Sequence, residues 1–138
     1  MLAISASCIT ACGIARWKCD GKLDMEVVLN ATLAGGVSVG SSSDLVVTGS
    51  VAMAIGALAG IISALGFLYL GAYLKEKIGL YDTCGVHNLH GMPGVLGGII
   101  GAISASFSGA AFGDGTAEQF NAFAAMAPVE AGGLGRTA

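Results

Sequence analysis

Charge is the property that this sequence has least of. Asp, Glu, Lys and Arg together make up 11% of its 138 residues, whereas an ordinary soluble domain carries about 25%. Hydrophobic residues make up 54%, and there are 23 glycines besides. A water-soluble protein of this length has too little interior to bury so much apolar surface, and glycine is frequent in membrane helices. The composition therefore argues against a soluble domain and indicates an integral membrane chain.

The sequence also lacks the patterns that catalysis, metal binding or a disulfide framework requires. Its four cysteines form no Cys-x-x-Cys pair and lie mostly in apolar segments, so we interpret them as small packing residues. Cys84, His87 and His90 would need a fourth zinc ligand, and none stands nearby in the sequence. No nucleophile lies at a useful spacing from a base. We expect no enzyme and no cofactor, and the net charge of −3 gives no reason to expect nucleic acid as a partner.

Charged residues are missing altogether from four long stretches. These stretches cover residues 1–15, 27–43, 45–74 and 83–113. A helix needs about 20 apolar residues to cross a bilayer, so the last two stretches are long enough, the second is at the lower limit and the first is short. Their apolar residues run on without alternation, which favours helices over a barrel. We expect an all-α, polytopic membrane helix bundle.

The predicted organisation is a partial transmembrane domain over residues 1–113, followed by a loop. The expected spans are about 1–15 (in part), 26–43, 46–74 and 83–108. The first stretch has no basic residues before its apolar part, which argues against a cleavable signal peptide. We interpret it as the end of a helix that begins upstream. Residues 114–138 carry several charges, and we expect them to form an extracytoplasmic loop before a last span that is missing here.

Glycine spacing indicates how these helices pack. Pairs of glycines four residues apart occur at 36/40, 56/60, 94/98 and 97/101. Small residues at this spacing share a helix face and allow two backbones to approach closely. Such pairs also arise by chance in a glycine-rich sequence, so they predict a compact bundle without identifying the partner of each helix.

Basic residues are confined almost wholly to two of the connections between spans. Arg16, Lys18 and Lys22 lie in the first connection, and Lys75 and Lys77 lie in the third. The second connection has no Lys or Arg, and the segment after the last span has a single arginine. Alternating spans place the first and third connections on one side of the membrane. The positive-inside rule predicts that this side is cytoplasmic.

Two histidines, His87 and His90, stand inside the uncharged run that begins at Thr83. An ionisable side chain within a span is costly and by default marks a pathway or a relay. The two are three residues apart, so they share roughly one helix face. Pro93 predicts a kink soon after His90, and Asp82 stands where it could cap the start of this helix. A histidine that merely packs is the alternative, and the residue pattern leaves it open.

Three segments carry longer and more specific motifs. They read Gly-Lys-Leu-Asp-Met at 21–25, Asn-Ala-Thr-Leu-Ala-Gly-Gly-Val-Ser-Val-Gly at 30–40, and Asp-Thr-Cys-Gly-Val-His-Asn-Leu-His-Gly-Met-Pro-Gly-Val-Leu-Gly-Gly at 82–98. In this order, over about residues 20–108, they resemble the Rhesus glycoprotein branch of the ammonium transporter family. The resemblance implies a C-terminal-half fragment of an ammonium/ammonia channel that is a homotrimer with one pore per subunit. It also implies a plasma-membrane location, and it leaves carbon dioxide open as a second solute.

The resemblance also assigns residues to the conduction pathway. The family's pore holds two facing histidines from different spans, and the second belongs to a His-Gly-x-x-Gly motif that begins here at His90. By this resemblance the pathway residues are His90, Val86 and Leu89, and the supporting helix start and pore backbone are Asp82, Gly91, Pro93 and Gly94. His87 does not match the pore histidine. The first pore histidine and the aromatic gate belong to earlier spans, which this chain does not contain.

Two alternatives stand beside the channel interpretation. Some members of this branch are structural partners in membrane complexes and do not conduct, and these members depart from the histidine pair. The retained His90 favours conduction over that role. Haem ligation by His87 and His90 would need further ligands, because residues three apart on one helix cannot hold opposite faces of one haem.

Overall fold

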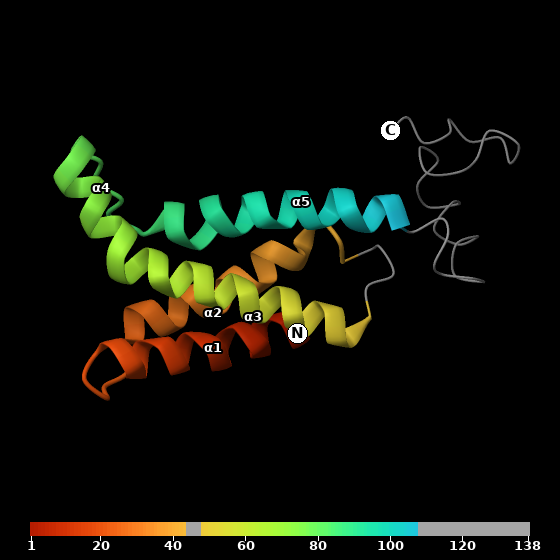
Figure 1. Cartoon of the computed structure of the whole chain (residues 1–138), viewed down its shortest axis with the longest axis horizontal. Coiled ribbons are helices and arrows are strands. Elements are labelled where there is room, and N and C mark those ends of the chain that lie inside the picture. The colour runs from red at the N-terminus through yellow and green to blue at the C-terminus, as the bar shows by residue number, and fades with distance from the viewer. Residues whose placement is uncertain (44–47, 108–138) are drawn as a thin grey trace, which may run out of the picture.

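Helices form all of the regular structure in the part of the chain that is described. The computed structural model describes residues 1–43 and 48–107. Its elements are α1 (Leu2–Lys18), α2 (Met25–Gly40), α3 (Gly49–Leu65), η1 (Gly66–Leu70), α4 (Gly71–Ile78), η2 (His87–Gly91) and α5 (Met92–Phe107), in which η1 and η2 are π-helical turns (Figure 1). The predicted all-α class is confirmed within these residues. The loop predicted at 114–138 lies outside them.

Close contacts between small residues bring α1, α2 and α3 together. A β-carbon added at Gly56 would lie 2.5 Å from Cα of Ala3, and one added at Gly60 would lie 2.6 Å from the carbonyl oxygen of Ser7. The earlier glycine of the 56/60 pair thus meets the earlier residue on α1, and the later glycine meets the later residue. Helices α1 and α3 are therefore parallel. Gly35 of α2 meets the same Ala3 carbonyl. Glycine thus allows the backbones to touch, as its spacing predicts.

Hydroxyl groups add hydrogen bonds across these contacts. The Ser7 hydroxyl donates to the carbonyl of Ala31 on α2. The Thr10 hydroxyl lies 3.2 Å from the carbonyl oxygen of Ala57 on α3. Interhelical hydrogen bonds of this kind are a common source of association between membrane helices, where apolar side chains gain little by leaving lipid.

Large apolar side chains mostly point away from the core. The buried core cluster consists of small residues, which are Ala11, Ala15, Val27, Ala31 and Ala64. By contrast, Ile9 is 71% exposed and Val95 is 66% exposed. A soluble monomer rarely exposes so much continuous apolar surface. The arrangement is typical of a bundle that faces lipid or further helices.

One helical stretch is long and apolar enough to cross a membrane. It runs without interruption from Gly49 to Ile78, 30 residues through α3, η1 and α4. Helix α2 is apolar but shorter, and no other helix among residues 1–43 and 48–107 meets the same length and composition. The remaining span boundaries stay predictions. The sequence did not predict the π-helical turns, which lie within two of the expected spans.

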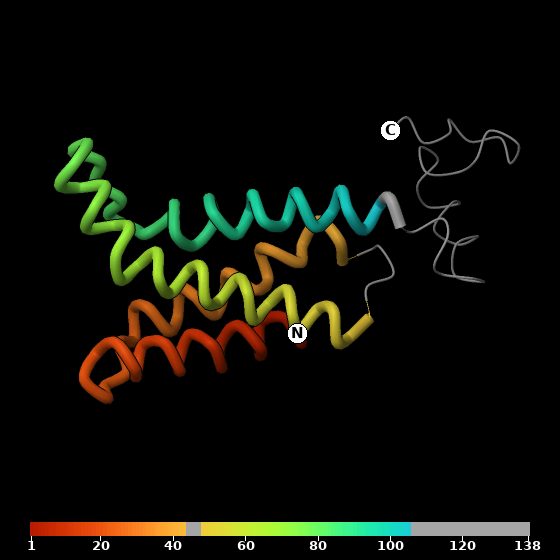
Figure 2. The backbone as a smooth tube through the Cα atoms, viewed as in Figure 1, coloured from red at the N-terminus to blue at the C-terminus, as the bar shows by residue number. Residues whose placement is uncertain are grey.

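The two basic connections lie at the same end of the bundle. Figures 1 and 2 show the turn between α1 and α2 at the end where α4 and the connection into η2 also lie. Aromatic rings accompany the basic groups there: Nζ of Lys18 is 3.7 Å from the ring centroid of Trp17 and 5.9 Å from that of Tyr69. Nζ of Lys75 is 5.1 Å from the ring centroid of Tyr81. Basic residues together with Trp and Tyr are typical of a cytoplasmic membrane interface.

Candidate functional site

The helix that carries both histidines begins at a carboxylate cap. Oδ1 of Asp82 accepts a hydrogen bond from the backbone N–H of Val86 at 2.9 Å, and Oδ2 accepts one from that of His87 at 2.8 Å. The first turn of a helix leaves such N–H groups without partners, and a carboxylate also interacts favourably with the helix dipole. Gly85, in this turn, has φ +64°, a left-handed conformation that favours glycine. The capped turn fixes where η2 begins.

Directly after this start, η2 widens into a π-helical turn. The backbone N–H of Met92 donates to the carbonyl of His87, five residues earlier. The next residue, Pro93, has no N–H to offer to the carbonyl of Leu89, four residues earlier, and a proline ring crowds that position. A wide turn ahead of a proline therefore relieves a conflict that a regular α-helix would contain. Such turns occur often at functional sites.

Small residues allow α5 to pack closely against α2. The hydroxyl of Ser38 donates to the carbonyl of Pro93 at 3.1 Å, and that of Ser41 donates to the carbonyl of Gly97 at 2.6 Å. A β-carbon at Gly97 would lie 2.9 Å from the Ser38 carbonyl oxygen, and one at Gly101 would lie 2.9 Å from the Ser41 hydroxyl. The 97/101 glycine pair thus faces α2. One side of α5 is closed by this contact.

The predicted pathway residues divide between this closed side and the open side. His90, Val86, Gly91 and Gly94 are exposed, and Leu89 is half-buried. On the supporting backbone, Pro93 is fully buried against α2 and Asp82 is half-buried. The other histidine of the pair, at position 87, is exposed as well. The structure therefore brings the pore-motif histidine to the open side of η2.

Asn88 is the residue of this segment that the sequence did not single out. It is 3% exposed, and its Oδ1 atom accepts no hydrogen bond from the described residues. A β-carbon at Gly66 would lie 2.7 Å from this oxygen, so the amide side chain reaches from η2 to η1. The signal that the sequence offered for this residue was an amide side chain within an otherwise apolar run. Only the packing shows that this polar residue is buried while its neighbours are not.

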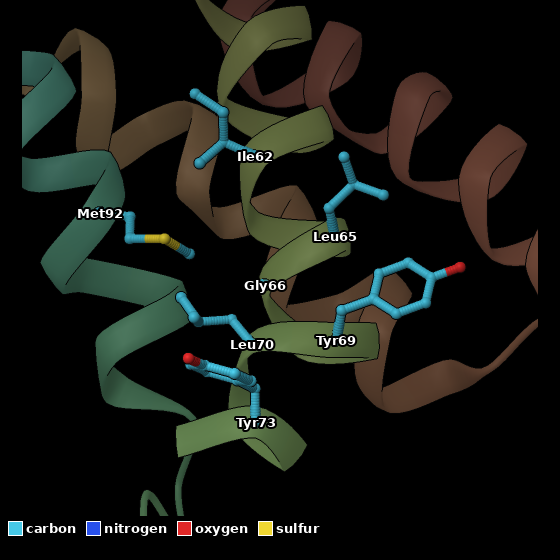
Figure 3. Close-up of a pocket in the computed structure, with 7 residues that line it drawn as sticks. All are labelled: Ile62, Leu65, Gly66, Tyr69, Leu70, Tyr73 and Met92. Atoms are coloured by element: carbon cyan, nitrogen blue, oxygen red, sulfur yellow. The ribbon is translucent and has the colours of Figure 1, made fainter. Parts of the chain in front are cut away.

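Two hollows lie beside the histidine segment. An apolar groove of about 810 Å³ is lined by Ile62, Leu65, Gly66, Tyr69, Leu70, Tyr73 and Met92 (Figure 3). A smaller pocket of about 140 Å³ lies between α4 and the connection into η2, and Asp82 is among its lining residues together with Lys75. None of the predicted pathway residues, all of which are described, lines the larger groove. Within the described residues no three His, Cys, Asp or Glu side chains gather as metal ligands do.

The family is decided by comparison with known proteins. The sequence model of the Ammonium Transporter Family matches residues 1–128. The chain belongs to this family. Relatives place it in the Rhesus branch: it is 56% identical over 102 residues to ammonium transporter Rh type B-B of Xenopus laevis and 51% identical over 88 residues to ammonium transporter Rh type C of Rattus norvegicus. The resemblance seen in the three sequence motifs is confirmed.

A solved structure supports the same fold. Rh50 of Nitrosomonas europaea, described as a conducting channel of the Rhesus protein family, superposes with a TM-score of 0.71 at 39% identity, over 74% of this chain and 27% of that chain. The predicted membrane helix bundle of the ammonium transporter type is confirmed. The matches cover 73% of this chain and 22% of the Xenopus laevis protein, and 64% of this chain and 18% of the rat protein. The chain therefore spans about a fifth of the length of these relatives.

Proposed function

We propose that this chain is part of an ammonium/ammonia channel in which His90 is one of two pore histidines. Val86 and Leu89 contribute apolar surface beside it. Asp82 fixes the helix start, and the backbone around Pro93 shapes the turn that presents the imidazole. The activity is transport and not enzymatic catalysis.

The observation that carries this proposal is the placement of His90. Its imidazole lies on the open side of η2, while Pro93 in the next turn is buried against α2. A histidine that only packed in the bundle would lie among the buried residues of that contact. Outside that contact an exposed side chain faces lipid, further helices or a solute pathway, and the match of His90 to the pore motif favours the pathway.

The chemistry of ammonium suits an imidazole at this position. An ammonium ion entering an apolar pore loses solvation worth many kcal/mol, whereas neutral ammonia loses far less. Passage is easier when the ion gives up its proton before the apolar section. A neutral imidazole offers one hydrogen-bond donor and one acceptor, so it can receive ammonia or relay a proton.

Orientation, assembly and location complete the proposal. The basic, aromatic end of the bundle faces the cytoplasm, in keeping with the positive-inside rule. The complete channel is a homotrimer in the plasma membrane. Its substrate is ammonium or ammonia, with carbon dioxide as a candidate second solute.

The experiment uses a chimera in which this chain replaces the stretch of the Xenopus laevis Rh type B-B transporter that it matches. Uptake of radiolabelled methylammonium is measured in cells at equal surface expression. The His90→Ala variant loses a hydrogen-bonding group worth about 1.5 kcal/mol or more to a charged solute, so uptake is expected to fall about tenfold. The matched control is His87→Asn, three residues away and also exposed, which is expected to keep uptake near the level of the unmutated chimera.

Two outcomes would contradict the proposal. Unchanged uptake and selectivity in His90→Ala would remove this residue from the mechanism. A chimera that reaches the surface in normal amount but takes up no methylammonium would favour the alternative, a structural subunit that does not conduct.

A further inference from the structure

Side chains connect η1 with η2 and the turn that leads into it, although these segments are far apart in the sequence. Each contact pairs a glycine of one segment with a side chain of the other, and one of the two glycines, Gly85, lies in the turn before η2 begins. The Asn88 side chain of η2 reaches Gly66 of η1, and the Phe67 side chain of η1 reaches Gly85. We call these four residues the η1–η2 clasp.

The first half of the clasp is the buried amide of Asn88. A β-carbon at Gly66 would lie 2.7 Å from Oδ1 and 3.1 Å from Cγ of this amide, and one at Gly71 would lie 3.7 Å from Nδ2. The amide therefore lies along η1 from its first residue to the residue after its last. The N–H of Gly71 donates to the carbonyl of Gly66, which is the hydrogen bond that closes the π-helical turn. Asn88 thus rests directly on the widened turn of the neighbouring helix.

The second half of the clasp runs the other way. A β-carbon at Gly85 would lie 2.5 Å from Cζ of Phe67 and would overlap Cε1 of the same ring. The carbonyl of Gly85 accepts the first bond of the following helix, from the N–H of Leu89 at 2.8 Å. The ring of Phe67 therefore packs against Gly85, in the turn just before η2 starts at His87. Figure 3 shows Met92, just after η2, directed toward the same part of η1 near Gly66.

Together with the packing of η2 on α2 and α3, the two contacts constrain the rotation and the axial position of η2. Residues two apart on a helix lie on nearly opposite sides of its axis, because successive residues are about 100° apart. Burying Asn88 against η1 therefore turns position 90 outward, and His90 is indeed exposed. A buried amide oxygen without a partner breaks the usual rule for polar groups, and such departures concentrate at functional sites.

We infer that Asn88 is a positioning residue: through its contact with Gly66 it holds the His90 imidazole toward the solute pathway. This inference rests on the proposed role of His90 in conduction. It adds that the geometry of the histidine is set from α3–η1–α4, the continuous helix on the far side of the clasp, and not by Pro93 alone. A register change in that helix would then alter transport although no pathway residue is touched.

The test is a set of variants in the same chimera, at equal surface expression. Gly66→Ala places a methyl group against the Asn88 amide and against Cε of Met92, the end of a flexible side chain that can turn aside, and is expected to lower methylammonium uptake about tenfold through the amide. Asn88→Ala alone leaves the space beside Gly66 empty, and it is expected to lower uptake less than Gly66→Ala does. In the double variant Gly66→Ala/Asn88→Ala the new methyl occupies the vacated space, so uptake is expected to recover to within about threefold of the unmutated chimera. Gly13→Ala, at an exposed helical glycine with nothing within 4 Å of its added β-carbon, is the matched control.

A second measurement separates positioning from mere packing. If Gly66→Ala acts by displacing the imidazole, adding His90→Ala to it lowers uptake less than threefold further, because that contribution is already lost. If the two effects multiply, to about a hundredfold, the positioning role is refuted while the channel role of His90 stands. An additive response of Gly66→Ala and Asn88→Ala, without recovery in the double variant, refutes the clasp. No effect of His90→Ala on its own overturns the proposed function instead.

Discussion

The contact between α1 and α3 makes a sharp prediction about glycine. At Gly56 an added β-carbon would lie 2.5 Å from Cα and 2.6 Å from the carbonyl carbon of Ala3, and both of these are backbone atoms. Ordinary contact between carbon atoms needs about 3.5–4.0 Å, so α1 must move away by about 1 Å along this line. A movement of that size forfeits between a quarter and a half of the dispersion energy of each affected atom pair. We therefore expect Gly56→Ala to destabilise the bundle by about 2–3 kcal/mol, near the upper end of the usual cost of overpacking.

Two further glycines serve as internal controls for this prediction. At Gly36 an added β-carbon would meet only the end of the Ile4 side chain, at 3.3 Å, and that side chain can turn aside. At Gly13 nothing lies within 4 Å. Alanine has a better helix propensity than glycine by about 1 kcal/mol or less, so Gly13→Ala is expected to be neutral or slightly stabilising and Gly36→Ala nearly neutral.

The assay is the temperature at which the purified chimera loses its monodisperse elution peak in a mild detergent. The expected order of midpoints is Gly13→Ala at or above the unmutated chimera, then Gly36→Ala, then Gly56→Ala well below both. An equal midpoint for Gly56→Ala and Gly13→Ala would refute the reasoning, because it would mean that the backbones of α1 and α3 do not touch at this glycine.

Further predictions concern the histidine helix and use the same chimera. Asp82→Ala frees two backbone N–H groups at the helix start and should cost about 1–2 kcal/mol in thermal stability, with Asp82→Asn recovering part of it; equal midpoints for both would argue against the cap. Ser38→Ala removes the hydroxyl that donates to the carbonyl of Pro93 and, within α2, to that of Ala34, and it should cost about 0.6 kcal/mol, the average for interhelical bonds in membrane helices; a loss several times larger would mean that the hydroxyl does more than pair with these two carbonyls. Pro93→Ala restores a backbone N–H, so the turn can become α-helical and rotate His90; uptake should fall about tenfold with little change in thermal midpoint, and unchanged uptake would show that the proline is not needed to present the imidazole.

The membrane class and the helix start were predictable because both depend on local chemistry. A low content of charge and long uncharged runs follow directly from residue type, and they indicate helices whatever the neighbours are. Asp82 caps η2 because a carboxylate a few residues before a helix finds free N–H groups in any context. The two basic connections likewise lie at the same end of the bundle because successive spans alternate in direction.

The π-helical turns and the buried amide were not predictable in the same way. A turn widens when the energy of packing exceeds the small loss in backbone hydrogen bonding, and the packing partners of η2 come from α2, α3 and η1, all of them well before it in the chain. The burial of Asn88 depends on the absence of a side chain at Gly66, and neither residue is informative alone. Glycine spacing has the same limit: the 56/60 pair touches α1, whereas an added β-carbon at Gly94 or Gly98 meets nothing within 4 Å.

The same physics that holds the bundle together also decides which side of α5 is free to meet a solute. In lipid, apolar side chains gain little by leaving their surroundings, so close backbones and hydroxyl-to-carbonyl bonds supply the association energy. On α5 these small-residue contacts, at Pro93 and Gly97, all face α2 and leave no space for a solute there. The hydroxyls of Ser38 and Ser41 on that side already donate to carbonyls of α5. The opposite side is therefore where the proposed role of His90 places the solute, and there the imidazole is exposed and the inferred clasp with η1 would set its orientation.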